Sequence, residues 1–432
     1  MTSGCSSPGA TRGPYKIMII NDYSPEETHG ISVHFLHLVR RLRERGHTVV
    51  VFTTSKQLDS TSHRMWSITN MYNPGNRMGV FPGFKFYQRL VAERWDLIHV
   101  VYPTVLPWFV LPFAAARGIP TYCSHHVDLS FYNKAYNSHS CVAKCLETGA
   151  ACCIYFPTGC FGTTHAAPTY AAMRKEKPRY CRGYVDFIPT SIDKSRFFLK
   201  DDRERGAERA EFCAKAKLRT DDLIVLMVSR LAPEKGQEEV LQAFDKLVHL
   251  QRDRPWQLVL VGDGPSRMKL EGVVNDKQLP VTFLGMLPNE TLPPIYRSVD
   301  CFVTCSMSET FGITVLEAIA CGCPVVMPRM DVFEELYGSD LGDCMYDKNN
   351  GESMAKAIHA ASSAEAKARV KSANHWKGLY LSWEDAVTEQ EKQYAAMITE
   401  YRSAHCCGRI GPKKGERIRN RAYTASHPDP EV

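Results

Sequence analysis

Residues 308–326, S-E-T-F-G-I-T-V-L-E-A-I-A-C-G-C-P-V-V, have the pattern of a loop, a glycine turn and a short helix. A buried strand is predicted just before them, at V-D-C-F-V-T-C, and the apolar spacing becomes helical from Ile313 onward. The helix is therefore predicted to begin after Gly312 and to stop at Gly322 and Pro324. A strand, a turn and a helix in this order indicate an α/β domain.

The start of this helix is suited to a sugar nucleotide. Its first N–H groups lack partners inside the helix and the peptide dipoles add positive potential, so a diphosphate is well placed there. Gly312 lets the backbone come close to such a ligand. Glu317 can accept hydrogen bonds from vicinal ribose hydroxyls, and Glu309 in the preceding loop can face the sugar. The alternative is a core helix whose carboxylates interact only with its dipole.

Length and composition indicate a globular protein with two domains. The chain has 432 residues, beyond the limit of roughly 250 to 300 for one core. Its 44% hydrophobic and 23% charged residues are ordinary for such proteins. The longest apolar run, residues 104–116, is too short to span a bilayer, so we expect core and no transmembrane helix. Residues before Tyr15 lack an apolar segment, which leaves the localisation open between cytoplasm and plastid.

The sixteen cysteines are scattered through expected strands and helices. Buried free thiols explain this better than a disulfide framework, which is typical of small secreted domains. The cluster of Cys141, Cys145, Cys152, Cys153 and Cys160 leaves a structural zinc site open, although no second pair at zinc-finger spacing follows it.

Strands and helices alternate in two halves of the chain. We expect an N-terminal Rossmann-like domain over residues 15–193, a charged linker over 194–221 and a second Rossmann-like domain over 222–381. A helix over 382–402 is expected to cross back onto the first domain, and 403–432 form a basic tail. Ligands of such sheets bind at the carboxyl ends of the strands, so we expect the site in a cleft between the halves.

Two cations and a glycine turn belong to the second half. Arg230 and Lys235 follow a predicted strand, where their charges would neutralise a diphosphate as it leaves; alone, such a pair is more often solvated. The V-G-D-G-P turn contains Gly262 and Gly264. It lacks the third glycine of a dinucleotide fingerprint, and Pro265 stands where a phosphate-binding helix would begin. This disfavours a nicotinamide-dependent oxidoreductase.

The first half is expected to provide the acceptor side and one catalytic contact. S-H-H-V-D follows a predicted strand and puts His125, His126 and Asp128 at its carboxyl end. The alternative is a pair of histidines satisfied in a polar loop. Gly30 lies in the loop after the first strand, where the backbone can approach the ligand.

The run with two glutamates separated by seven residues resembles the donor-site motif of retaining glycosyltransferases of family 4, which have the GT-B fold. The resemblance covers about residues 16–401. It implies that the catalytic residues are His126, Arg230, Lys235 and Glu309. It implies that the donor is held by Gly30, Gly262, Gly264, Phe311, Gly312, Ile313, Thr314 and Glu317.

Within the family the sequence most resembles sulfoquinovosyltransferases that glycosylate diacylglycerol. The resemblance implies a UDP-sugar donor, such as UDP-sulfoquinovose, a lipid acceptor and no metal or other cofactor. Hexosyl- or mannosyltransferases with other lipid-linked or polysaccharide acceptors remain an alternative. A binding protein that holds a nucleotide sugar without turnover is an alternative of another class, and the intact Glu309, Arg230 and Lys235 argue against it.

Two segments indicate a peripheral membrane protein. Residues 71–89 interleave Phe81, Phe84, Phe86 and Tyr87 with basic residues, as interfacial segments do. Residues 405–421 hold six Lys or Arg against one acid, which suits anionic lipid and leaves the rest of the chain near neutral. We therefore expect no nucleic-acid partner. The alternative for residues 71–89 is an ordinary loop folded onto the core, and the alternative for the tail is a solvated segment. Cys406 and Cys407 are candidates for acylation.

Overall fold

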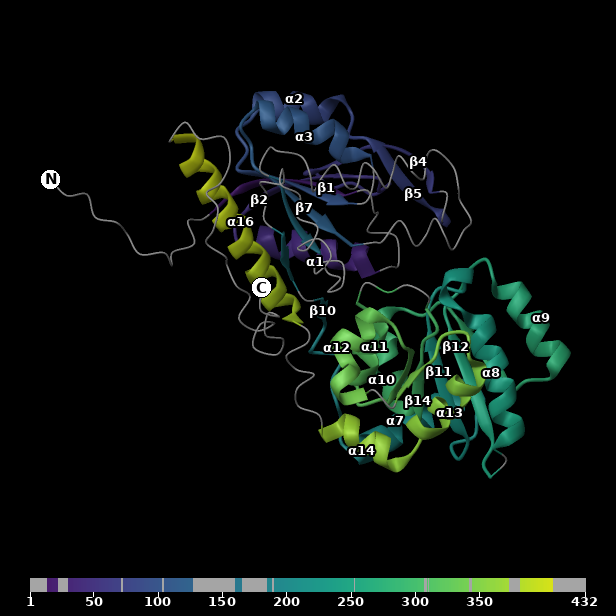
Figure 1. Ribbon diagram of the computed structural model, residues 1–432. Coiled ribbons are helices and arrows are strands. Elements are labelled where there is room, and N and C mark those ends of the chain that lie inside the picture. Colours follow the sequence, from purple (N-terminus) through teal and green to yellow (C-terminus); the bar gives the residue numbers. More distant parts are fainter. Residues whose placement is uncertain are drawn as a thin grey trace. The chain divides into compact units, whose positions relative to one another are not determined.

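The computed structural model describes residues 14–21, 30–70, 73–102, 105–126, 160–164, 185–188, 190–251, 253–306, 309, 311–341, 344–372 and 381–406. The chain forms two units, each an α/β structure (Figure 1). Unit 1 comprises residues 1–189 and 383–432, and unit 2 comprises residues 190–382. The C-terminal part of the chain therefore belongs to the same unit as the N-terminal part.

Unit 1 is built on a seven-stranded parallel sheet with the order β3-β2-β1-β6-β7-β8-β9. The strands are β1 (Lys16–Asn21), β2 (Thr48–Thr53), β3 (Ser62–Arg64), β6 (Leu97–Tyr102), β7 (Thr121–His125), β8 (Cys160–Thr164) and β9 (Val185–Phe187). In β1, Met18 and Ile20 pack into one core cluster and Ile17 and Ile19 into another. The strand is continuously apolar because both faces of the sheet are covered.

Two pairs of helices cover the two faces of this sheet. On one face lie α2 (Phe84–Ala92) and α3 (Leu106–Ala116). On the other lie α1 (Gly30–Glu44) and α16 (Trp383–Cys406), which pack against each other (Figure 1). The helix expected over 382–402 thus packs on unit 1 and continues to Cys406. The tail after it lies outside the described residues, Cys407 included.

An antiparallel hairpin follows β3. It consists of β4 (Trp66–Asn70) and β5 (Asn73–Phe81). The segment expected at 71–89 is therefore not one interfacial stretch: its described part is a strand followed by α2. The prediction that Phe86 lies in an interfacial segment is wrong, because its side chain is fully buried in the core under α2. One proline and two glycines in β5 explain why the sequence did not predict this strand, since both residue types are depleted in strands.

Within the apolar run at 104–116, Leu106–Ala116 form α3, and the expectation that this run is core is half correct. Leu106, Val110 and Ala114 are buried against the sheet. Trp108 and Phe113, on the other side of the helix, are about half exposed. The sequence is apolar all round, so periodicity could not distinguish the two faces.

Unit 2 contains a six-stranded parallel sheet with the order β13-β12-β11-β14-β15-β16. The strands are β11 (Leu223–Val228), β12 (Trp256–Val261), β13 (Val281–Gly285), β14 (Cys301–Val303), β15 (Val325–Pro328) and β16 (Met345–Tyr346). A separate pair joins β10 (Ser191–Ile192) to β17 (Leu381–Ser382). The parallel order places the loops after β11, β12 and β14 side by side.

The helices of unit 2 are α7 (Asp202–Ala216), α8 (Gln237–Leu250), α9 (Arg267–Lys277), α10 (Leu292–Ser298), α11 (Ile313–Ala320), α12 (Asp331–Leu341), α13 (Gly351–Ala361) and α14 (Ala364–Ser372). Two short 3₁₀ turns, η1 (Pro233–Lys235) and η2 (Asn289–Thr291), lie in the loops. The linker expected over 194–221 is wrong, because it contains α7, which packs against α10. Glu208 on α7 pairs with the buried Arg297, with 2.7 Å between Oε2 and Nε. The unit boundary is at Thr190, not after Asp193.

Candidate active site

The predicted donor-site residues of unit 2 lie in loops at the carboxyl ends of its strands. Arg230 and Lys235 follow β11, Gly262 follows β12, and Glu309 follows β14. Since β11 pairs in parallel with both β12 and β14, these loops share one edge of the sheet. The sequence-predicted residues are therefore brought to one side of unit 2.

Lys235 and Glu309 are in direct contact. The Nζ atom of Lys235 lies 2.7 Å from Oε1 of Glu309 and 3.2 Å from Oγ of Ser306. Gly236 makes this approach possible, because its φ is +67° and a Cβ there would lie 2.5 Å from the carbonyl oxygen of Cys305. Two residues 74 positions apart thus form one charged pair at the sheet edge.

Arg230 is held by its own loop. Its Nη1 lies 3.3 Å from Oε1 of the buried Glu234, and the amide of Gln237 donates to the Arg230 carbonyl oxygen over 2.7 Å. The Gln237 amide also donates to Oγ of Ser229. Sequence reasoning missed Glu234 and Gln237, although both lie next to the predicted cations.

The V-G-D-G-P turn packs tightly against this loop. A Cβ at Gly262, where φ is +133°, would lie 1.9 Å from the carbonyl oxygen of Ser229, and one at Gly264 would lie 2.4 Å from that of Leu231. The N–H of Leu231 donates to the carbonyl of Asp263 across the same contact. In the structure both glycines therefore let the turn pack closely against the Arg230 loop. Their contact with a donor stays a prediction.

The helix α11 begins at Ile313, as predicted, with Gly312 at φ +76° before it. Gly312, the N-cap residue, makes no side-chain capping hydrogen bond, and a Cβ there would lie 2.7 Å from the ring of Phe333. Phe311 is buried, whereas Ile313 and Thr314 are half-buried, and the contact of all three with a donor stays a prediction. The helix start keeps the features that suit a diphosphate.

Glu317 is 5% exposed and already has two protein donors. Its Oε1 accepts from Nδ2 of Asn289 over 3.0 Å, and its Oε2 accepts from the Tyr296 hydroxyl over 2.9 Å. Burial raises the pKa of Glu317 to about 7, and the two hydrogen bonds lower it by less. Sequence reasoning missed Asn289 and Tyr296. The available signal was Asn289, a polar residue in the loop after β13.

Replacing Glu317 by glutamine is expected to stabilise the protein at pH 8 but not at pH 4. The raised pKa means that the folded state binds a proton at Glu317 more tightly than the unfolded state does. The wild-type protein is therefore most stable below about pH 4.5, and it loses this contribution of Glu317 as the pH rises through 7. The difference in unfolding free energy should reach about 3 kcal/mol at pH 8. Urea unfolding of Glu317→Gln and of the exposed control Glu290→Gln measures it. An equal effect at both pH values would contradict the raised pKa.

His126 in unit 1 belongs to a chain of hydrogen bonds. Its Nε2 lies 3.0 Å from Oγ of Ser124, which lies 2.7 Å from Nε2 of His99. Nδ1 of His99 in turn lies 2.5 Å from the hydroxyl of Tyr394 on α16. All four side chains are buried. The helix α16 therefore holds the imidazole of His126 through the side chains of His99 and Ser124.

Aromatic side chains surround the same histidine. The rings of His34 and Phe35, both on α1, lie 5.8 Å and 5.4 Å from the ring of His126. Trp383, at the start of α16, lies 5.7 Å from His34. Sequence reasoning missed His34, although it lies one helical turn after Gly30, which is the first residue of α1. Asp128 and the side chain of His125 lie outside the described residues.

Among the residues that the structure describes, no three His, Cys, Asp or Glu side chains gather in a way that could hold a metal ion. Of the cysteine cluster, Cys160 lies in β8, and Cys141, Cys145, Cys152 and Cys153 lie outside the described residues. Seven of the described cysteines are buried thiols: Cys123, Cys213, Cys301, Cys305, Cys321, Cys323 and Cys344.

Two protein families match the chain, one in each unit. The family described as Glycosyl transferases group 1 matches residues 208–377, and Glycosyltransferase Family 4 matches residues 28–143. Together they cover about two thirds of the chain. The chain belongs to the family 4 glycosyltransferases. It is a transferase enzyme, as the double-glutamate run indicated.

This family 4 glycosyltransferase is similar to curated proteins over most of its length. It is 22% identical over 353 residues to the alpha-monoglucosyldiacylglycerol synthase of Acholeplasma laidlawii, which covers 78% of this chain and 85% of that one. It is 25% identical over 345 residues to the sulfoquinovosyl transferase of Arabidopsis thaliana, covering 77% of this chain and 63% of that one.

Solved structures establish the fold of the family 4 glycosyltransferase. Sucrose-phosphate synthase from Thermosynechococcus elongatus aligns with a TM-score of 0.66 at 18% identity, over 89% of this chain and all of the other. Such a likeness shows the fold alone. The prediction of a GT-B fold with two Rossmann-like domains is confirmed.

Proposed function

We propose that this glycosyltransferase moves a sugar, with retention of anomeric configuration, from a UDP-sugar to a lipid acceptor. The observation that carries the proposal is the contact between Lys235 and Glu309 on the edge that also holds Arg230 and the start of α11. This arrangement places positive charge where a diphosphate would leave and a carboxylate where a sugar would lie.

In the proposed mechanism the acceptor hydroxyl attacks the anomeric carbon on the face that the diphosphate leaves. The carbon–oxygen bond to the phosphate breaks, and the departing phosphate takes the proton of the acceptor hydroxyl. Arg230, Lys235 and the start of α11 stabilise the leaving charge, while His126 contacts the donor sugar. Because fixed cations stabilise the leaving group, we expect no metal requirement and no cofactor.

The names of the relatives support a lipid acceptor, since a monoglucosyldiacylglycerol synthase and a sulfoquinovosyl transferase are among them. UDP-sulfoquinovose and diacylglycerol are our first candidates for donor and acceptor. A mannosyltransferase remains the second, since GDP-mannose-dependent alpha-mannosyltransferases of mycobacteria are also similar, at 24% and 27% identity.

Product analysis tests the proposed function. The full chain is incubated with UDP-sulfoquinovose, UDP-glucose or GDP-mannose and with vesicles containing diacylglycerol, and products are identified by mass spectrometry and NMR. We expect one donor to yield an α-linked glycolipid, with turnover that persists in excess EDTA. A β-linked product would contradict retention, and a complete loss in EDTA that metal restores would contradict the metal-independent mechanism. Donor binding without any transfer would favour the non-catalytic alternative.

An aromatic surface on unit 1 supports action at a membrane. It comprises six side chains of the hairpin, α2 and α3 that are linked by ring contacts: Trp66, Phe81, Phe84, Tyr87, Phe109 and Phe113. Phe84 is 68% and Trp66 is 61% exposed, and both rings contact that of Phe81. Phe81 also contacts the ring of Phe109, 5.3 Å away. No helix in the described part of the chain is both long and apolar enough to cross a membrane.

Removing two aromatic side chains is expected to weaken binding to vesicles. Trp66→Ser together with Phe84→Ser should lower the affinity at least tenfold, because each buried aromatic ring contributes about 1.5–3 kcal/mol when it leaves water. Vesicle sedimentation measures the effect. The control is Leu250→Ser with Met268→Ser, which removes two exposed apolar side chains of unit 2. Equal losses in both variants would contradict the assignment of this surface.

A further inference from the structure

A buried hydrogen-bond network in unit 1 leads from α16 to His126. It begins at the hydroxyl of Tyr394 on α16, which lies 2.5 Å from Nδ1 of His99 on β6. Nε2 of His99 lies 2.7 Å from Oγ of Ser124 on β7, and this oxygen lies 3.0 Å from Nε2 of His126. Tyr394 and His99 are fully buried, and Ser124 is 1% exposed. Each hydroxyl proton of the network therefore needs an acceptor within the protein.

The direction of the hydrogen bonds is set at the Tyr394 end of the network. Among the residues that the structure describes, Nδ1 of His99 is the one hydrogen-bond partner of the Tyr394 hydroxyl. A buried hydroxyl proton without an acceptor is costly, so the phenol donates to Nδ1. Burial raises the pKa of Tyr394 well above its ordinary value, which keeps this proton on the phenol. Nδ1 of His99 therefore accepts and carries no proton.

The other proton positions follow from the number of donors in each group. With Nδ1 accepting, the neutral ring of His99 carries its proton on Nε2 and donates it to Oγ of Ser124. A hydroxyl has a single proton, so Ser124 donates to Nε2 of His126. Neutral His126 then carries its proton on Nδ1. The reverse order of donors would leave the buried phenol proton of Tyr394 without an acceptor.

The hydrogen bonds select a tautomer, which ring packing alone does not do. The ring of Phe35 lies 5.4 Å from that of His126, with 82° between the two planes. Such a contact fixes the plane of the imidazole and not the place of its proton. The tautomer decides what the ring offers to a ligand, because a protonated nitrogen donates and an unprotonated one accepts.

We propose that Tyr394, His99 and Ser124 are positioning residues that hold His126 as the neutral tautomer with its proton on Nδ1. The inference rests on the proposed function in one respect: His126 contacts the donor sugar. In this tautomer Nε2 already accepts the Ser124 proton, and Nδ1 is already protonated. His126 therefore brings a hydrogen-bond donor without positive charge, and it does not act as a general base. The proton of the acceptor hydroxyl is left to the departing phosphate.

Nitrogen chemical shifts test the tautomer in the wild-type protein. The full chain is prepared with isotope-labelled histidine, and a long-range proton–nitrogen correlation spectrum distinguishes protonated from unprotonated ring nitrogens. The signals of His126 are those lost in His126→Gln. At about pH 8, where an ordinary histidine is neutral, we expect a protonated Nδ1 and an unprotonated Nε2. A protonated Nε2 on His126 would overturn the proposal.

Tyr394→Phe interrupts the network at the end far from His126. The variant removes the phenol oxygen and keeps the ring, which contacts the rings of His99 and Tyr122. We expect His126 to lose its single tautomer and kcat to fall roughly two- to tenfold, the effect of one neutral hydrogen bond. The KM of the UDP-sugar should stay within about twofold, because the diphosphate binds to unit 2 in the proposed function.

Tyr122→Phe is the matched control for Tyr394→Phe. The hydroxyl of Tyr122 donates to Oε1 of Gln393 on α16 over 2.8 Å, and both side chains are buried. This variant therefore also removes a phenol oxygen that bonds β7 to α16, but outside the network. It should keep the His126 signals and the kcat of the wild type. Equal losses of kcat in the two variants would show that both hydroxyls only stabilise α16, which would overturn the positioning role.

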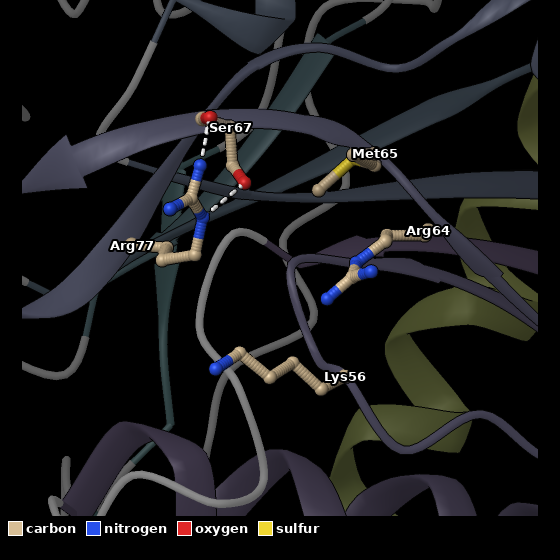
Figure 2. A pocket seen from close by; sticks show the side chains of 5 residues that line it. All are labelled: Lys56, Arg64, Met65, Ser67 and Arg77. Atoms are coloured by element: carbon tan, nitrogen blue, oxygen red, sulfur yellow. Dashed lines mark hydrogen bonds between the residues drawn. The ribbon is translucent and has the colours of Figure 1, made fainter.

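A second pair of variants tests the network beside His126. Ser124→Ala removes the hydroxyl between the two histidines and should reproduce both effects of Tyr394→Phe. Ser67→Ala is its control in the same unit. Figure 2 shows the Ser67 hydroxyl on β4 with Nε of Arg77, which donates to it over 2.7 Å. The control should keep the wild-type signals of His126. Wild-type signals and kcat in both Tyr394→Phe and Ser124→Ala would overturn the proposal.

The proposed function and the tautomer fail in different measurements. If the wild-type protein transfers no sugar, the proposed function is refuted, and the nitrogen signals still decide the tautomer. If the wild-type protein transfers sugar but its His126 carries the proton on Nε2, the positioning role fails and the proposed function stands.

Discussion

Replacing Arg230 or Lys235 by alanine is expected to lower glycosyl transfer roughly 10²- to 10³-fold, because each change removes a fixed charge from the leaving diphosphate. Lys235 should show the larger effect. Its ammonium also contacts Glu309 at 2.7 Å, so its loss leaves that carboxylate without this partner. The rate of product formation at saturating donor is the measurement.

The control for this experiment is Lys269→Ala. Lys269 forms an exposed pair with Glu238 at 2.6 Å, and such pairs contribute little to stability or to a distant site. Urea unfolding of each variant should match the wild type, which ties any loss of rate to chemistry. Wild-type rates in both Arg230→Ala and Lys235→Ala would refute their assignment as catalytic residues.

Gly262→Ala is expected to destabilise the protein by about 3 kcal/mol or more, through overpacking and a strained backbone. A Cβ at this position would lie 1.9 Å from the Ser229 carbonyl oxygen, which is backbone and has no room to move. The φ of +133° adds strain for any L side chain. Because the same contact positions the Arg230 loop, residual folded protein should also lose activity.

Gly272→Ala is the matched control, with an expected effect of opposite sign. Gly272 lies inside α9, and a Cβ there would meet nothing within 4 Å. Alanine should stabilise the helix by about 0.5–1 kcal/mol, since glycine is the more flexible residue in the unfolded chain. Thermal unfolding of both variants measures the contrast. Similar stability of the two would contradict the close packing of the turn.

The sequence predicted those parts of the fold that depend on local pattern. The start of α11 after Gly312 is confirmed, because a change from strand to helical spacing at a glycine is a local signal. The sequence did not predict β5, because its local pattern is misleading. Its proline and glycines are typical of turns, and only pairing with β4 makes it a strand. The charged segment before β11 was predicted as a linker, but packing against α10 stabilises α7 there.

For the candidate site, too, the sequence predicted what depends on local pattern and not the contacts between distant residues. The sequence by itself determined which residue types stand after which strands, and so indicated Arg230, Lys235, Glu309 and His126. Only the tertiary structure decided that Asn289 and Tyr296 bind Glu317, and that His99 and Tyr394 hold His126 through Ser124.

The charged pair of unit 2 depends on tertiary structure in the same way. Lys235 and Glu309 lie 74 positions apart, and they meet because β11 and β14 are parallel neighbours whose following loops share one edge of the sheet. The sequence encodes side-chain chemistry and local backbone preference. The contacts between distant residues depend on how strands pair and helices pack, and neither is visible in local spacing.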